Sequence, residues 1–156
     1  MATSLSMKSD PVGLKRLSEL RSVLLDGIKK CGEVAFSIAN DTLRKTLLTL
    51  EQQSKQYLNE INSQIEVLGG KPKYASFQQN PALNFIKEKK KPTNNLEKQA
   101  LKVCGKIESS VIHLYSKILR EPFENDNLKK LIQYQMNGIM RTTLQLKLLS
   151  KFLHTQ

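Results

Sequence analysis

The sequence contains few of the residues that interrupt helices. Its 156 residues include no tryptophan, seven glycines, five prolines and two cysteines. Because glycine and proline are the usual breaks in helical sequences, their scarcity favours long uninterrupted helices. Cys31 and Cys104 lie far apart in the sequence and match no metal-binding spacing. We interpret them as buried thiols of a protein in the reducing cytoplasm.

Long apolar runs are also missing. Residues 1–9 are short of apolar side chains and do not have the hydrophobic stretch of a secretory signal. No run approaches the roughly 18 apolar residues of a membrane span. We therefore expect a cytoplasmic protein without membrane insertion. The length fits one domain of ordinary size, over residues 10–153, preceded by a flexible N-terminus over 1–9.

Acidic residues are scarce in the second part of the chain. The formal net charge is +11, and residues 71–156 carry an excess of ten basic residues against an excess of one in 1–70. The densest basic run contains Lys87, Lys89, Lys90 and Lys91, with Phe85 as the only nearby aromatic residue. Such a surface attracts nucleic acid or another anionic surface. A solvated lysine-rich helix surface produces the same count, so support for nucleic-acid binding is weak.

Four segments carry apolar residues at steps of three and four, the period of amphipathic helices. The pattern predicts helices over about 12–39, 41–68, 95–120 and 126–153. Asn40 or Asp41 can cap the second helix, and Gly69-Gly70 followed by Pro72 ends it. We therefore predict an all-α fold.

The lengths of the connections indicate how the helices are arranged. The first two helices are joined so tightly that they must be antiparallel neighbours. The connection over 69–94 is long enough to return along a helix of roughly 42 Å, at 1.5 Å per residue. The second and third helices can then run parallel. The expected fold is a ferritin-like four-helix bundle with one long crossover between its second and third helices.

Three stretches of the sequence resemble a known family. They are Leu17-Ser18-Glu19-Leu20 with Asp26-Gly27, then Glu66-Val67-Leu68-Gly69-Gly70-Lys71-Pro72, and finally Cys104, Glu108 and Tyr115 followed by Leu119 and Pro122. In order and spacing they resemble a bacterial ferritin-like family of four-helix domains of unknown function, over about residues 14–150. The resemblance implies the bundle fold. It implies no activity, because fold alone does not determine function.

The residues that a di-iron bundle needs are largely missing. Such a bundle takes a carboxylate from each of two helices and a Glu-x-x-His pair from each of the other two. The only histidines are His113, expected on an exposed face, and His154 near the C-terminus, and neither follows a glutamate by three residues. Ser54 stands three residues after Glu51, and Gly138 three after Gln135. We therefore expect no metal, no cofactor and no enzymatic activity.

Glu108 is the one carboxylate expected in the core. It falls inside the apolar arc of the third helix, and a buried carboxyl group needs hydrogen-bond partners or a proton. We predict a core polar cluster in which Gln135 is the nearest neighbour, with Tyr115 and Ser54 as further members. The alternative interpretation is a degenerate metal or ligand site centred on Glu108.

The last helix carries a second apolar stripe. Met140, Leu144, Leu148 and Phe152 recur every four residues on the side opposite the inward stripe, which is predicted to consist of Leu128, Leu131, Gln135, Ile139, Leu146 and Leu149. Burying about 400 Å² of such a stripe is worth on the order of 10 kcal/mol before association costs. We predict a homodimer interface. Alternatively, the last helical turns bend across the bundle end, or the crossover covers the stripe.

These observations lead to three hypotheses of function. The first is a non-catalytic, homo-oligomeric interaction or structural protein. The second is an electrostatic binder of nucleic acid or an anionic surface through residues 71–156. The third is an oxidoreductase or iron-storage protein with an unusual metal site centred on Glu108.

Overall fold

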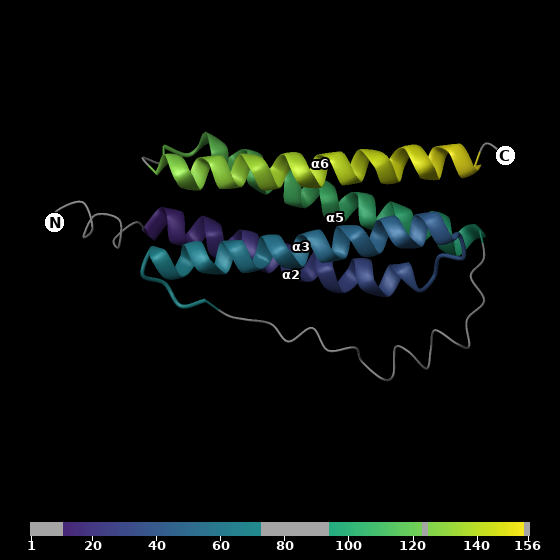
Figure 1. Ribbon diagram of the computed structural model, residues 1–156, viewed down its shortest axis with the longest axis horizontal. Coiled ribbons are helices and arrows are strands. Elements are labelled where there is room, and N and C mark those ends of the chain that lie inside the picture. Colours follow the sequence, from purple (N-terminus) through teal and green to yellow (C-terminus); the bar gives the residue numbers. More distant parts are fainter. Residues whose placement is uncertain (1–10, 73–93, 123–124, 155–156) are drawn as a thin grey trace.

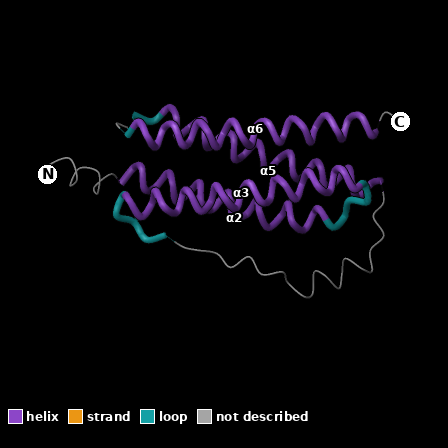
Figure 2. Tube along the Cα trace, in the orientation of Figure 1, coloured by secondary structure: helices purple, strands orange, loops and turns teal. Residues whose placement is uncertain are grey.

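The chain forms a helical bundle. The computed structural model describes residues 11–72, 94–122 and 125–154, and these contain four helices: α2 (Pro11–Ala35), α3 (Asp41–Val67), α5 (Asn94–Arg120) and α6 (Asp126–His154) (Figure 1). Within these ranges there is no strand (Figure 2). The all-α prediction is confirmed for this part of the chain. The predicted flexible N-terminus and most of the predicted crossover lie outside the described residues.

The four helices are arranged as a square. Helix α2 packs against α3 and α5, and α6 packs against the same two helices. Figure 1 shows that α2 and α6 run in one direction and that α3 and α5 run in the other. Every pair of packed neighbours is therefore antiparallel, and the two diagonal pairs are parallel. None of the helices in the described ranges is long and apolar enough for a membrane span.

Helix α3 begins and ends with local signals that the sequence contains. The side chain of Asn40 accepts a hydrogen bond of 3.0 Å from the backbone N–H of Leu43 and caps the first turn. At the other end Gly69 has a φ of 86°, a left-handed conformation that suits glycine. The N–H of Gly70 then donates to the carbonyl of Ile65 at 2.9 Å. The chain leaves the helix at the predicted glycine pair.

Helix α2 ends at Ala35, four residues before its predicted end at 39. Beyond it the backbone bonds join residues three apart, such as Ser37 N–H to Val34 at 2.9 Å, so the helix tightens and stops. The guanidinium of Arg44 donates to the carbonyl of Ile38 at 2.6 Å and holds the reversal toward α3. The apolar period continues through Ile38, which is buried although it lies beyond the helix. The period therefore does not show where α2 ends. The bounds of the other three helices differ from the predicted ones by at most one residue.

The core lies between the inward stripes. On the first two helices the residues that recur at steps of three and four are all buried, namely Leu17, Leu20, Leu24, Ile28, Cys31, Ala35 and Ile38, then Leu43, Leu47, Leu50, Ser54, Leu58, Ile61, Ile65 and Leu68. Near the start of α6 the prediction was wrong, because Ile132 is buried whereas Leu131 is only half-buried. The inward face of α6 is thus turned by one residue near its start. Leu149, also predicted inward, is half-buried.

Candidate functional site

The described histidine does not face the core. His113 on α5 is exposed, as predicted. The side chain of His154 lies outside the described residues. In the described part of the chain, no three His, Cys, Asp or Glu side chains come together in a way that could hold a metal ion.

A small cavity lies where all four helices meet, and it is the natural candidate for a buried site. Its volume is about 20 Å³, room for about one water molecule. The polar groups that line it are the Cys31 thiol, the Ser54 hydroxyl and the Glu108 carboxyl, and the remaining lining is Leu24, Gly27, Leu50, Ile107, Val111 and Ile139. A di-metal pair needs several carboxylates and imidazole nitrogen. One carboxyl among aliphatic side chains does not fit that pair.

Glu108 is buried beside this cavity, as expected, with only 3% of its surface exposed. Its Oε1 atom has no hydrogen-bond partner among the described residues. Burial raises the pKa of the Glu108 carboxyl to about 7, while the nearby Thr143 hydroxyl and the Lys147 ammonium lower it. The Thr143 oxygen also has no partner of good geometry in the described ranges, so its contact with Glu108 stabilises the charged form only weakly. The carboxyl group therefore exchanges its proton near neutral pH.

Gln135 is buried, but its neighbours differ from the prediction. Its amide does not bond to Glu108. Its Oε1 accepts from the Tyr115 hydroxyl at 2.8 Å, and its Nε2 donates to the Glu60 carboxylate at 2.9 Å and to the Tyr57 carbonyl at 3.2 Å. The predicted cluster is thus two separate groups, Glu108 with Ser54 at the cavity and Tyr115 with Gln135 elsewhere. The second group joins α3, α5 and α6 through one amide.

A further polar chain between α3 and α6 was missed by the sequence reasoning. The Thr142 hydroxyl donates to Gln53 Oε1 at 3.0 Å, and Gln53 Nε2 donates to the Tyr57 hydroxyl at 3.2 Å. A Cβ atom at Gly138 would collide with that hydroxyl. The space beside Gly138 is therefore filled by the phenol of Tyr57. The sequence feature that indicates such a polar chain is the Thr142-Thr143 pair within the inward stripe of α6.

The outer face of α6 exposes the predicted apolar stripe, which we call the α6 stripe. The exposed fractions are 46% for Met140, 56% for Leu144, 59% for Leu148 and 60% for Phe152. Leu148 and Phe152 also border a surface groove of about 530 Å³ together with Gln145, Leu149 and Lys151. The described residues therefore leave these four large side chains in contact with solvent.

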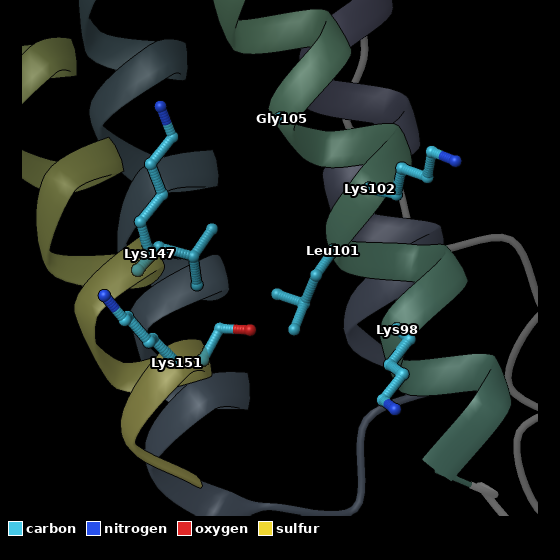
Figure 3. Close-up of a pocket in the computed structure, with 8 residues that line it drawn as sticks. Lys98, Leu101, Lys102, Gly105, Lys147 and Lys151 are labelled. Atoms are coloured by element: carbon cyan, nitrogen blue, oxygen red, sulfur yellow. The ribbon is translucent and has the colours of Figure 1, made fainter. Parts of the chain in front are cut away.

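A second groove, of about 360 Å³, lies between α5 and α6 (Figure 3). Leu101 points from α5 into the gap, and the lining also includes Lys98, Lys102, Lys147 and Lys151. In Figure 3 the Lys102 side chain extends away from α6. We call this groove, with its four lysines, the lysine groove. None of them forms an ion pair with a described carboxylate. The basic run predicted as a patch, Lys87, Lys89, Lys90 and Lys91, lies outside the described residues, so the lysine groove is a different surface.

The spacing of these lysines was visible in the sequence. Lys98 and Lys102, like Lys147 and Lys151, are four residues apart, and residues 127–156 contain no aspartate or glutamate. The short connection between the last two predicted helices also indicates an antiparallel pair, in which the start of α5 lies beside the end of α6. Antiparallel packing of the two helices brings the two lysine pairs to one groove.

Comparison with known proteins returned no matching family model, no matching curated protein and no matching solved structure.

Proposed function

We propose that this protein is a non-catalytic helical bundle of the cytoplasm that acts by association, and that its contact surface is the α6 stripe, which pairs with the same stripe of a second copy. The observation that carries the proposal is the exposure of four large apolar side chains in one row on a single helix. A contiguous apolar patch of this kind usually marks an interface. A twofold dimer is the commonest way to cover one.

The same arrangement supports a ferritin-like bundle. The parallel directions of α3 and α5 are those that a long crossover between the second and third helices would give (Figure 1). The cavity lined by Glu108 and Ser54 supports a bundle without the di-metal chemistry of that class, because its donor atoms do not suit a pair of cations.

Charge determines how the dimer responds to salt. The charged residues of α6 from Asn127 onward are all basic, and Arg141, Lys147 and Lys151 lie along or beside the stripe. Any pairing of α6 with α6 therefore brings like charges together at the rim. Salt weakens that repulsion, because the screening length is about 10 Å at 0.1 M ionic strength. It does not weaken the apolar contact. The dimer should tighten as salt is raised.

Sedimentation of the full chain at tens of micromolar tests the dimer. We expect a dimer that strengthens between 50 and 500 mM NaCl. Leu148→Ser should raise the dissociation constant by roughly 100-fold or more, because each substitution removes two leucines from a twofold interface. Val67→Ser on α3 is the matched control, since Val67 is 55% exposed and lies on another helix. Monomer at every salt concentration would disprove the homodimer.

A second candidate function is binding of nucleic acid or another anionic surface, and the lysine groove is the observation that favours it. Four lysines without described ion-pair partners line one groove in the acid-poor part of the chain. Binding of this kind weakens with salt, because bound lysines release counterions. The two candidates therefore respond to salt in opposite directions.

Fluorescence anisotropy with a labelled DNA duplex and with a single strand tests this alternative. Replacement of all four lysines of the lysine groove by glutamine should abolish binding. A control variant with the same loss of charge on the other two helices, Lys15→Gln, Lys29→Gln, Lys30→Gln and Lys45→Gln, should retain it. Equal loss in both variants would indicate a response to net charge and would exclude a specific role for the groove.

A further inference from the structure

The two cysteines of the chain meet in the core. The Sγ atoms of Cys31 on α2 and Cys104 on α5 are 3.3 Å apart, although the residues are 73 positions apart. Both are free thiols in this structure and share a hydrogen bond in which either sulfur can donate. Their exposed fractions are only 4% and 0%. The sequence predicts that both cysteines are buried, but it does not show that their side chains are in contact.

The contact follows from close packing of α2 and α5. One turn before Cys31, Gly27 lacks a side chain, and a Cβ there would lie 3.0 Å from the Cγ2 atom of Ile107. Helix α5 therefore approaches α2 closely at this level. Cysteine is itself small, so the two sulfurs fill the next position along the same line of contact.

We propose that Cys31 and Cys104 are a modification site, a buried dithiol that takes up a reversible disulfide and thereby cross-links α2 to α5. A disulfide bond is about 2.05 Å long, so each sulfur has to move by only roughly 0.6 Å. No other cysteine exists in the chain to compete for either partner. In the reducing cytoplasm the pair is a dithiol, and a peroxide oxidises it.

The reaction balances with hydrogen peroxide as the oxidant. The Cys31 sulfur attacks one peroxide oxygen, the O–O bond breaks, and a sulfenic acid and one water form. The Cys104 sulfur then attacks the sulfenic sulfur, the S–O bond breaks, and the hydroxide leaves as water with the Cys104 proton. Two thiols lose two electrons in total, and one peroxide becomes two waters.

The surroundings set the order of these steps. Cys31 is the more exposed of the two and lines the central cavity, whereas Cys104 does not line it. The hydrogen bond with Cys31, together with burial, raises the pKa of the Cys104 thiol. Because Cys31 is the sulfur that lines the cavity, it is the one that peroxide oxidises, and Cys104 is the resolving partner. The reaction in the folded protein is slow, since only a thiolate attacks efficiently.

The bond should stabilise the bundle considerably. It closes a loop that contains all of α3, and a loop of this length restricts the unfolded chain strongly. We expect the melting temperature to rise by on the order of 10 °C. Reduction should be slow in the native state and rapid in denaturant, because the sulfurs are buried. The α6 stripe contains neither cysteine, so the cross-link can be tested independently of the proposed dimer.

The experiment has two arms on the full chain. In the first, reduced protein is incubated with hydrogen peroxide, unfolded, and labelled with a maleimide. In the second, the chain is refolded from denaturant in a buffer of reduced and oxidised glutathione and labelled in the same way. Intact-mass measurement should show that both labels are lost together and that the chain has lost two hydrogen atoms. Non-reducing electrophoresis should show a monomer that migrates faster than the reduced chain.

Two single variants provide the control. In Cys31→Ser and in Cys104→Ser the remaining cysteine has no partner, so it should keep its label or gain oxygen, and peroxide should not raise the melting temperature. A disulfide in either arm of the wild-type experiment, accompanied by the rise in melting temperature, supports the proposal. Two labelled thiols after both arms, or a cross-link only between chains, would overturn it.

Discussion

Glu108 makes the stability of the bundle depend on pH. Its folded-state pKa of about 7 lies above its ordinary value of 4.5, so the folded state binds the proton more tightly than the unfolded chain. Stability is therefore greatest below about pH 4.5 as far as this group is concerned, and it falls as the pH rises through 7. We expect a loss of roughly 3 kcal/mol at most between these limits.

Urea unfolding at pH 5 and pH 8 measures this effect. Glu108→Gln cannot ionise, so it should be the less pH-dependent protein and the more stable one at pH 8. Glu33→Gln is the control, because Glu33 is exposed on α2. If Glu108→Gln loses as much stability between the two pH values as the wild type, the carboxyl group is not the cause.

A substitution at Tyr115 tests the role of the Gln135 amide, which joins α3, α5 and α6. In Tyr115→Phe the oxygen of Gln135 loses its donor inside the core, where both residues are fully buried. An unsatisfied buried acceptor costs about 1–3 kcal/mol, which should appear as a lower free energy of unfolding. The same substitution at Tyr134, which is 59% exposed, should change it by less than about 0.5 kcal/mol. Equal effects at the two tyrosines would contradict the proposed role of the bond.

The sequence predicted the burial of these residues and some of their neighbours, but not which side chains bond to one another. Glu108 and Gln135 fall within apolar stripes, and helical periodicity is enough to place them inside the bundle. Which residues meet across helices depends also on how far one helix is displaced along another. The helix rises 1.5 Å per residue. If one helix is displaced along its neighbour by one turn, each of its side chains contacts a different residue of that neighbour. For this reason helical periodicity does not show that Gln135 bonds to Tyr115 rather than to Glu108, or that the two cysteines touch.

At the scale of helices, α3 and α6 approach closely at Gly138. Alanine is favoured over glycine inside a helix by about 1 kcal/mol, so local propensity alone predicts that Gly138→Ala is stabilising. A Cβ atom there would collide with the Tyr57 hydroxyl, which the polar chain to Gln53 holds in place. We therefore expect Gly138→Ala to lower the free energy of unfolding by about 1–3 kcal/mol.

Gly105 on α5 is the matched control. A Cβ atom at this position would meet nothing within 4 Å, so Gly105→Ala should raise the free energy of unfolding by about 0.5–1 kcal/mol. Removal of the hydroxyl in Tyr57→Phe should recover part of the stability lost in Gly138→Ala. Two alanine variants that are stabilised alike would show that the helices do not require glycine at 138.

Most helix ends were predictable because they are signalled locally. The side chain of Asn40 caps α3, and Gly69 adopts the positive φ that ends it. The end of α2 was not predictable in this way. Ile38 remains buried beyond the last helical turn, so an apolar period continued past the end of the helix. Tertiary packing at the end of the bundle determines where α2 stops.

For the whole molecule, the uneven charge should make the bundle more stable in salt. Lysines four residues apart on one helix repel one another by about 0.2–0.5 kcal/mol per pair. The lysine groove contains two such pairs on packed helices, and residues 71–156, the part of the sequence that includes both helices, carry an excess of ten basic residues. Because salt screens these repulsions, raising NaCl from 50 to 500 mM should increase the free energy of unfolding by about 1 kcal/mol.

Unfolding should be measured in a Leu148→Ser background, so that salt-driven dimerisation does not add to the stability of the monomer. The further replacement of the four lysines of the lysine groove by glutamine should remove most of the gain in salt. The equivalent replacement of Lys15, Lys29, Lys30 and Lys45 should retain it, because Lys30 and Lys45 already face Asp26 and Asp41 at 3.3 and 3.1 Å. Should both sets respond to salt equally, the repulsion is spread over the whole surface. The lysine groove would then be no more repulsive than the rest of the surface, and its charge would not favour an anionic partner at that place.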